Sequence, residues 1–283
     1  MKLPFTPDLS GKVAVVTGGA GVLCREFCKA LALCGAKVAI LNRTLSRAEA
    51  VVQEIKAAGG EALAVQTDVT DAQSVAAAHE AVLSAYGACD ILVNGAGGND
   101  PSATADDEFF SAETMADPEK KSFFDLTPAS FGKVFGLNIM GTLIPTQAFA
   151  GDMVRTGSGC IVNISSMNAF TPLTKIPAYS AAKAGVSNFT QWLAVHFART
   201  GIRVNAIAPG FFSTAQNAKL LWNDDGTPTA RTGKILAATP MGRFGVPEEL
   251  LGALLFFVDE SCSRFVTGIV LPVDGGFSAY SGV

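Results

Sequence analysis

The chain has 283 residues, of which 49% are apolar and 16% charged, with 29 glycines and a formal net charge of −4. This composition fits a compact α/β core with many tight turns and excludes a disordered chain. No run of Lys or Arg exceeds two residues, and the apolar runs are far shorter than the roughly 18 residues of a membrane span. We therefore expect neither nucleic acid nor membrane as a partner.

The N-terminus, Met-Lys-Leu-Pro-Phe-Thr-Pro-Asp, lacks the apolar stretch of a signal peptide, which predicts a cytoplasmic protein. The six cysteines form no C-x-x-C pair, and the two histidines, His79 and His196, lack the spacing of metal ligands. Free, mostly buried thiols and no metal site are therefore expected. The cysteines stand at positions 24, 28, 34, 89, 160 and 262.

A fully apolar strand is predicted at 13–17, followed by a glycine-rich turn at 18–24 and a helix to about Cys34. Strand, glycine-rich turn and helix are the layout of a dinucleotide site. The glycines let the backbone approach a pyrophosphate, and the start of the helix offers free N–H groups. The pattern is weak when it stands alone.

The second strand, 38–41, ends at Asn42 and Arg43, before a helix at 45–58. An acidic residue at this place usually binds the adenosine ribose, whereas an arginine suits a 2′-phosphate. No acid is present and Arg43 follows directly, so NADP is favoured over NAD. A surface arginine on the turn into the helix is the alternative interpretation.

Strands are next predicted at 62–66 and 91–93, with a helix at 71–86 between them. The alternation of strand and helix predicts an α/β protein with a doubly wound parallel sheet, which the later segments bring to seven strands. Ligands of such sheets bind at the carboxyl ends of the strands. The loops after the first and fourth strands are two of those ends, and both are rich in glycine.

Residues 99–126 interrupt the alternation with an acidic, irregular insertion, which either covers the substrate or is a solvated excursion. Thr127 and Pro128 then start a helix as N-cap and first residue. That helix carries Asn138 among apolar neighbours, where its amide needs hydrogen-bond partners. An asparagine that simply bonds the backbone would satisfy the same requirement.

The stretch 160–185 holds a buried strand, the pair Ser165 and Ser166, a loop, and a helix that runs to about residue 200. Tyr179 and Lys183 lie four residues apart near the start of this helix, so they share one face. An ammonium beside a phenol lowers the pKa of the phenol, and such a pair can move a proton near neutral pH. A structural tyrosine beside a solvated lysine is the alternative.

The remaining elements are a sixth strand at 202–207, a helix at 248–258 and a last strand at 266–272. Residues 211–245 follow the sixth strand at the carboxyl edge of the sheet, where a lid over the substrate is expected. The pattern contains no repeat and no linker, so residues 1–283 are predicted to form one domain.

With these motifs in place, the chain closely resembles the short-chain dehydrogenase/reductase family over nearly its whole length, a family with a Rossmann fold. The matching motifs are Thr17-Gly18 with Gly21, Asp68-Val69, Asn94-Gly95-Ala96-Gly97, Asn138, Ser166, Tyr179 with Lys183, and Pro209-Gly210 with Thr214. Ser166 precedes Tyr179 by the family's usual 13 residues. The neighbouring Ser165 is expected to point the other way, because strand side chains alternate. One departure is Cys24, where the family turn has its last glycine.

The resemblance implies hydride transfer between a nicotinamide cofactor, NAD(P), and a secondary alcohol or ketone. Tyr179 would be the acid/base, Lys183 would hold the nicotinamide ribose, Ser166 would bind the substrate oxygen, and Asn138 would anchor a water. The cofactor residues implied are Thr17, Gly18, Gly19, Gly21, Val22, Leu23, Asn42, Arg43, Asp68, Val69, Asn94, Ala96, Gly97, Tyr179, Lys183, Pro209, Gly210, Phe212 and Thr214.

The insertion and the C-terminal tail are similar to those of a subgroup, the D-mannonate oxidoreductases or fructuronate reductases, which act on sugar acids. Candidate substrate residues are Gly98, Asn99, Asn168, Lys175 and Arg231. Another polyol, a ketone or a 3-oxoacyl compound is the alternative substrate, and a non-catalytic dinucleotide sensor is the alternative class. A homo-oligomer, tetramer or dimer, is usual in the family and is expected here.

Overall fold

Seven parallel strands form one sheet in the order β3-β2-β1-β4-β5-β6-β7. The computed structural model describes residues 1–213, 221–223 and 225–282. The strand order reverses between β1 and β4, which is where doubly wound sheets bind ligands. The strands are β1 (Val13–Thr17), β2 (Lys37–Asn42), β3 (Glu61–Gln66), β4 (Ile91–Asn94), β5 (Gly159–Ile164), β6 (Ile202–Pro209) and β7 (Val270–Val273).

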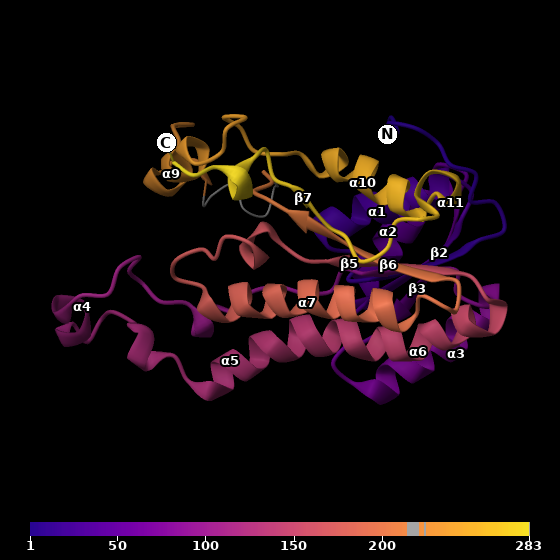
Figure 1. The fold of residues 1–283 in the computed structure, drawn as a ribbon, viewed down its shortest axis with the longest axis horizontal. Helices are drawn as coiled ribbons and strands as arrows, with labels where there is room; N and C mark the ends of the chain where they lie inside the picture. Colours follow the sequence, from indigo (N-terminus) through magenta and orange to yellow (C-terminus); the bar gives the residue numbers. More distant parts are fainter. Residues whose placement is uncertain (214–220, 224, 283) are drawn as a thin grey trace.

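Helices cover both faces of the sheet (Figure 1). On one face lie α1 (Val22–Leu33), α2 (Leu45–Ala57) and α10 (Leu251–Val258), and on the other lie α3 (Ala72–Tyr86), α6 (Gly141–Thr156) and α7 (Pro177–His196). The shorter helices are α4 (Ala112–Ala116), α5 (Pro128–Phe135), α9 (Ala230–Ala237) and α11 (Glu260–Ser263). The predicted fold class, a single domain with a doubly wound parallel sheet of seven strands, is confirmed.

The central strands are buried on both faces, because each layer of helices supplies an apolar core. Every residue of β1 is buried, and so is every residue of β4. Their side chains alternate between the two cores: Val16 and Val93 pack toward α1 and α10, whereas Val15 and Leu92 pack toward α3 and α6. This accounts for the uninterrupted apolar runs that predicted the strands. No helix within the described ranges has the length and apolarity of a membrane span.

The helix predicted after Thr127 consists of three consecutive helical segments. Thr127 caps α5 by accepting a hydrogen bond from Ser130 N–H, and Pro128 is the first helical residue, as predicted. The five residues Gly136–Met140 then form a turn of π-helix, and α6 continues from Gly141. The π turn contains Asn138, and such turns are frequent at functional sites.

The prediction was wrong at several element ends in the last third of the chain. The seventh strand begins at Val270 rather than at residue 266, because Gly268 has a φ of +82° and breaks the extended backbone. A short 3₁₀ turn, Pro247–Leu250, precedes α10 where one helix was expected. Helix α7 ends at His196, and the short helices α9 and α11 were not expected.

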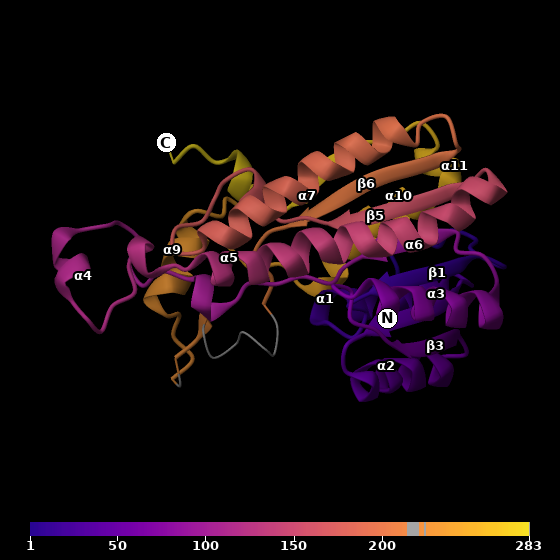
Figure 2. The ribbon, with the colours of Figure 1, turned by 90° about the horizontal axis from the view of Figure 1, so that it is seen from below.

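Residues 99–126, called the arm below, project beyond the carboxyl edge of the sheet in both views (Figures 1 and 2). Within the arm, the outgoing and returning segments are joined by the hydrogen bond from Asp106 N–H to Lys121 O at 2.9 Å. Contacts that join the arm to the body include the hydrogen bond from Ala105 N–H to Lys175 O at 2.7 Å and the ion pair of Glu108 with Lys234 of α9 at 2.8 Å. Near its start, Asp100 also pairs with Lys133 of α5. The arm therefore meets both the loop before α7 and the segment after β6.

Candidate active site

An elongated cleft runs along the carboxyl ends of β1, β2 and β4. It consists of two cavities of about 730 and 420 Å³ that share the lining residues Gly18, Gly21, Gly95 and Gly97. Cavities of this size suit small-molecule cofactors. The larger cavity extends toward β2 and β3, and the smaller one extends toward the end of β6, where Phe212 lines it.

The glycines on the cleft wall are required by close backbone approach. Gly18 has a φ of +63°, and a Cβ there would lie 2.9 Å from Ala96 Cα. A Cβ at Gly97 would lie 2.7 Å from Asn138 Oδ1 and 3.0 Å from Lys183 Nζ. Helix α1 begins after Gly21 with no side-chain cap and no acidic residue in its first turn, so its N–H groups are left for an anion. These residues fit the pyrophosphate of a dinucleotide.

Cys24 fits the turn because its neighbour across the cleft is Gly95. The Cys24 side chain is buried, and a Cβ at Gly95 would collide with its sulfur atom. The Cys24 thiol occupies the space that a side chain at Gly95 would need. Because Gly95 has none, the turn accommodates a cysteine where the family motif has its last glycine. Thr17 joins the same two segments, since its hydroxyl accepts from Gly95 N–H at 3.1 Å and from Ala96 N–H at 3.2 Å.

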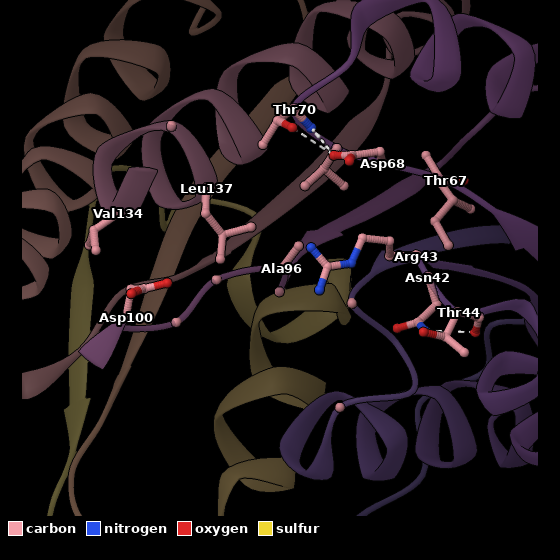
Figure 3. Close-up of a pocket in the computed structure, with 18 of the residues that line it drawn as sticks. Asn42, Arg43, Thr44, Thr67, Asp68, Thr70, Ala96, Asp100, Val134 and Leu137 are labelled. Atoms are coloured by element: carbon pink, nitrogen blue, oxygen red, sulfur yellow. Dashed lines mark hydrogen bonds between the residues drawn. The ribbon is translucent and has the colours of Figure 1, made fainter. Parts of the chain in front are cut away.

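Polar side chains surround the far end of the larger cavity, beyond β2 (Figure 3). Arg43 lines this cavity, and in the view of Figure 3 its guanidinium lies beside Ala96 and below Asp68. Hydrogen bonds from Thr70 hold the pKa of Asp68 below its ordinary value, helped by the charge of Arg43. Asn42 instead donates to Thr44 O at 2.9 Å within its own turn. Residues that line the larger cavity but were not predicted from the sequence include Thr44, Arg47, Thr67 and Thr70 at this end and Lys133 of α5 at the other.

The structure brings Ser166, Tyr179, Lys183 and Asn138 together beside the shared glycines. Lys183 is 4% exposed, and its Nζ donates to Ile164 O at 2.7 Å and lies 5.7 Å from the centre of the Tyr179 ring. Asn138 is fully buried, and its amide exchanges hydrogen bonds with Gly98, donating to Gly98 O at 2.8 Å and accepting from Gly98 N–H at 3.2 Å.

Burial governs the protonation of the tyrosine–lysine pair. It lowers the pKa of Lys183 to about 8 from its ordinary 10.5, because the apolar surroundings penalise the ammonium. Burial also raises the pKa of Tyr179, and the interaction with the Ser166 hydroxyl offsets only part of that rise. The expected lowering of the Tyr179 pKa is therefore corrected, because desolvation of the phenolate raises this pKa in the structure.

The serine pair divides as strand alternation predicted. Ser165 turns to α7, where its hydroxyl lies 2.7 Å from Ser187 Oγ and donates to Lys183 O at 3.2 Å. Ser166 faces Tyr179, and its hydroxyl accepts from Asn168 N–H at 3.2 Å. Asn168 is 4% exposed, so a sequence-predicted substrate residue is buried directly behind Ser166.

Asn99 lines the larger cavity, and its amide donates to Thr104 inside the arm at 2.9 Å. Two other predicted residues lie away from the cleft surface. Asn94 is buried under the loop, where its amide donates to Asn163 and Thr146. Lys175 is exposed at a φ of +61° against the arm. It lines a separate cavity of about 240 Å³ together with Phe109 and Phe123.

The ends of β6 and β7 meet beside the smaller cavity, where the sequence predicted the nicotinamide. Pro209 ends β6, and a Cβ at Gly210 would lie 2.5 Å from Asp274 Cα, so only glycine allows this approach. Arg231 lies on the exposed surface of α9. Thr214, also predicted to bind the cofactor, falls outside the described residues. Among those that are described, no group of three or more His, Cys, Asp or Glu side chains could hold a metal ion.

Comparison with known proteins identifies the family. The model of the short chain dehydrogenase family matches residues 12–224, which is most of the chain. The chain therefore belongs to this family, and it is an NAD(P)-dependent oxidoreductase. Several motifs that suggested the resemblance meet at the cleft described above: Gly18, Gly21, Asp68, Val69, Gly95, Ala96, Gly97 and Gly210 line it, and Asn138 and Lys183 lie against Gly97.

Individual relatives are similar over nearly the full length. An uncharacterized oxidoreductase of Bacillus subtilis (strain 168), UxuB, is 55% identical over 99% of this chain and 100% of its own. A crystal structure from Haemophilus influenzae with bound NAD, assigned provisionally as a D-mannonate oxidoreductase, has a TM-score of 0.95 at 53% identity and 98% coverage of both chains. Cis-4-hydroxycyclohexanecarboxylate dehydrogenase of Sinomonas cyclohexanicum is 35% identical over 95% of this chain and 97% of its own.

Proposed function

We propose that this oxidoreductase interconverts a secondary hydroxyl and a keto group on a sugar acid of the D-mannonate/D-fructuronate type. The observation that carries the reaction type is the cluster of Tyr179, Ser166 and buried Lys183 beside the glycine-lined cleft. Two relatives support an acidic substrate: one is provisionally assigned to D-mannonate, and the other acts on a hydroxy acid with a ring.

The chain's own residues would position the reactants and move the proton. When bound, the nicotinamide supplies or accepts the hydride. The Tyr179 phenol would give its proton to the keto oxygen during reduction and take it back during oxidation. The Ser166 hydroxyl would donate a hydrogen bond to the same oxygen and stabilise the charge that grows there. Lys183 and Asn138 would hold the ribose and a water on the far side of Tyr179.

Arg231 is the cation that we propose for the substrate carboxylate. It lies three residues before Lys234, so both project from one side of α9. Lys234 pairs with Glu108 of the arm, whereas Arg231 forms no ion pair with any residue that the structure describes. Lys175, the other cationic candidate, faces the acidic arm. Hydrogen bonds from Lys120 and Lys234 lower the pKa of Asp107 and of Glu108 respectively, and the charge of Lys175 adds a smaller lowering to both.

A substrate panel tests this proposal. The protein is incubated with NADH or NADPH and a set of uronates, ketoses and simple ketones, and the absorbance of the reduced nicotinamide is followed. Turnover should be greatest with keto sugar acids. Replacing Arg231 with Ala should raise KM for an acidic substrate more than for a neutral one, with Lys175→Ala as the matched variant. Equal effects of Arg231→Ala on KM for both substrate classes would contradict a contact between Arg231 and the carboxylate. Tight cofactor binding without any turnover would favour a non-catalytic sensor.

We further propose that NADP is preferred to NAD. Arg43 and Arg47 both line the far end of the cleft, and β2 ends without an acidic residue. An arginine here suits a 2′-phosphate. The similar Haemophilus influenzae protein holds NAD, so the ratio of kcat/KM for NADPH to that for NADH decides the question. The proposal requires this ratio to exceed one and to fall when Arg43 is replaced by Ala.

The oligomeric state is a separate proposal. Trp192 on the outer surface of α7 is 55% exposed and stacks on His196 with 4.6 Å between ring centres, and Val195 beside it is 79% exposed. We propose that this surface joins copies of the chain in a homo-oligomer. Light scattering should report a multimer that Trp192→Ala together with Val195→Ser shifts toward the monomer.

A further inference from the structure

A line of polar side chains crosses the apolar interior beneath the candidate catalytic residues. Asn94 at the end of β4, Asn163 in β5, Thr146 in α6 and Thr190 in α7 are each at most 2% exposed. Asn94 Nδ2 donates to Asn163 Oδ1 at 2.8 Å and to Thr146 Oγ1 at 3.0 Å. Asn163 Nδ2 donates to Thr190 Oγ1 at 2.9 Å. These four side chains, called the amide seam, join two strands to two helices.

The amide seam has one consistent orientation. Thr190 Oγ1 donates its hydrogen to Val186 O at 2.8 Å, and Thr146 Oγ1 donates to Thr142 O at 2.7 Å. Because both hydroxyl hydrogens are committed to helix carbonyls, the hydroxyls can only accept from the amides. Turning the Asn163 amide over would set two N–H groups face to face. The seam therefore specifies how the helices sit on the strands.

On α7 the seam shares a face with the candidate catalytic pair. Thr190 follows Lys183 by seven residues and Tyr179 by eleven, and these spacings return to the same side of a helix. Lys183 Nζ bonds Ile164 O, and Thr190 Oγ1 bonds Asn163, the neighbouring residue of β5. These two residues lie two turns apart, about 10 Å along the helix axis. Between them, Ser165 at the end of β5 also contacts α7, at Ser187 Oγ and at Lys183 O. Of these contacts that of Thr190 lies farthest from Tyr179, so it limits tilting of α7 about the others.

On α6 the seam leads to Asn138. Thr142, whose carbonyl accepts from Thr146, donates its own hydroxyl to Asn138 O at 2.9 Å. The Asn138 amide in turn holds Gly98 on the cleft wall. One continuous set of hydrogen bonds thus runs from α7, which carries Lys183, to the π turn that carries Asn138.

The amide seam also contains one atom that lowers the stability of the fold. Asn94 Oδ1 is buried and has no hydrogen-bond partner among the residues that the structure describes. A buried polar atom without a partner lowers stability, and an apolar side chain of the same shape would avoid the loss. Polar groups retained at such a cost are expected where geometry matters more than stability.

We propose that Asn163 and Thr190 are positioning residues that fix the place of Lys183 relative to Tyr179 and Asn138. The proposal rests on the proposed function of these residues in proton transfer. Neither positioning residue touches the cleft, and each acts through α7. If the seam is broken, α7 gains freedom at Thr190, and the ammonium of Lys183 stabilises the phenolate of Tyr179 less well.

The test compares Thr190→Val, which keeps the shape and removes the hydroxyl, with Thr190→Ser, which keeps the hydroxyl. Because misplacement by about 1 Å can cost on the order of 10² in rate, Thr190→Val should lower kcat by about tenfold and leave KM for the dinucleotide unchanged. Thr190→Ser should retain wild-type kcat. The pH at which alcohol oxidation reaches half its maximum should rise in Thr190→Val only.

The control is Ser263→Ala in α11, which removes an equally buried hydroxyl that donates to Phe257 O at 3.0 Å. It should lower Tm as Thr190→Val does, with kcat and pH profile unchanged. Thr146→Val breaks the seam from α6 and provides a second variant if Thr190→Val does not fold. Loss of Tm without change in kcat or pH profile, in either seam variant, would overturn the positioning role.

A readout without substrate separates this proposal from the proposed function. The chain has three tyrosines, so ultraviolet absorbance can follow phenolate formation, and subtraction of the Tyr179→Phe titration isolates Tyr179. The Tyr179 pKa should rise in Thr190→Val. If Tyr179→Phe keeps full turnover, the catalytic assignment fails while this titration still decides the positioning. An unchanged Tyr179 pKa in both seam variants contradicts the proposal.

Discussion

Two regions at the carboxyl edge of the sheet are held together by opposite physical principles. The cofactor cleft is lined by glycines and held from below by buried hydrogen bonds, such as those of Asn138 and the amide seam. The arm and α9 are instead joined by an exposed ion pair, and the arm carries uncovered aromatic rings, with Phe109 81% and Phe124 69% exposed. Interactions in the first region are shielded from water, so the loss of one of them should change activity or stability more than the loss of an exposed interaction in the second region.

The largest effect is expected at Tyr179. Replacing it with Phe removes the phenol and should lower kcat on the order of 10²- to 10⁴-fold, because general acid/base groups typically contribute that much. Cofactor affinity should stay near the wild-type value, because the ring remains in place. Steady-state kinetics and dinucleotide titration measure the two quantities. Unchanged turnover of Tyr179→Phe would contradict the assignment of Tyr179 as the acid/base.

The next effect concerns the pH dependence of stability. Lys183 has its folded-state pKa lowered to about 8 from 10.5, so its charged form opposes folding below about pH 8. The unfolded state binds more protons between these values, and this lysine should therefore make the free energy of unfolding rise with pH from about 8 to 10.5, by about 3 kcal/mol in total. Denaturant titrations of wild type and Lys183→Met across this range isolate the contribution. A parallel pH dependence in both proteins would contradict it.

A smaller effect is expected from Gly18→Ala on the cleft wall. The residue has a φ of +63°, and the new Cβ would meet Ala96 Cα at 2.9 Å, so the cleft must shift. The Kd of the dinucleotide should rise by about tenfold, since such backbone strain costs on the order of 1–3 kcal/mol.

Gly59→Ala is the matched control, because Gly59 has a φ of +84° with nothing within 4 Å of the added Cβ. It carries the same backbone strain without touching the cleft. It should lower Tm and leave the Kd of the dinucleotide unchanged. A similar rise in Kd for both variants would mean that lowered stability, rather than the wall of the cleft, controls cofactor binding.

The smallest effect is expected at the ion pair between the arm and α9. Glu108→Gln or Lys234→Met should change KM for the substrate by about two- to fivefold, because exposed ion pairs are weak and screened by salt. The difference from wild type should shrink at high ionic strength. Asp107→Asn, which removes an ion pair inside the arm, is the control and should leave KM unchanged. A tenfold change in KM, as large as the change in Kd expected for Gly18→Ala, would contradict the prediction that interactions in the arm are weaker than those in the cleft.

The motifs by themselves determined the fold and the position of the glycine-lined cleft. Alternating apolar runs and helices predicted all seven strands, and the glycines at 18, 21, 95 and 97 predicted the cleft wall, because each element's pattern is local in the chain. The spacing of Ser166, Tyr179 and Lys183 likewise brought the candidate catalytic residues together. These features depend on neighbours within a few residues or on a strand end, which a sequence displays directly.

Only the tertiary structure decided what depends on burial and on contacts between distant segments. It reversed the expected shift of the Tyr179 pKa, because desolvation is a property of the whole surrounding and not of the Tyr–Lys spacing. It also moved Asn94 from the cleft to the buried amide seam, since its partner Asn163 lies 69 positions away in sequence. Likewise, the pairing of Glu108 with Lys234 joins segments 126 residues apart, and no local pattern could have predicted it.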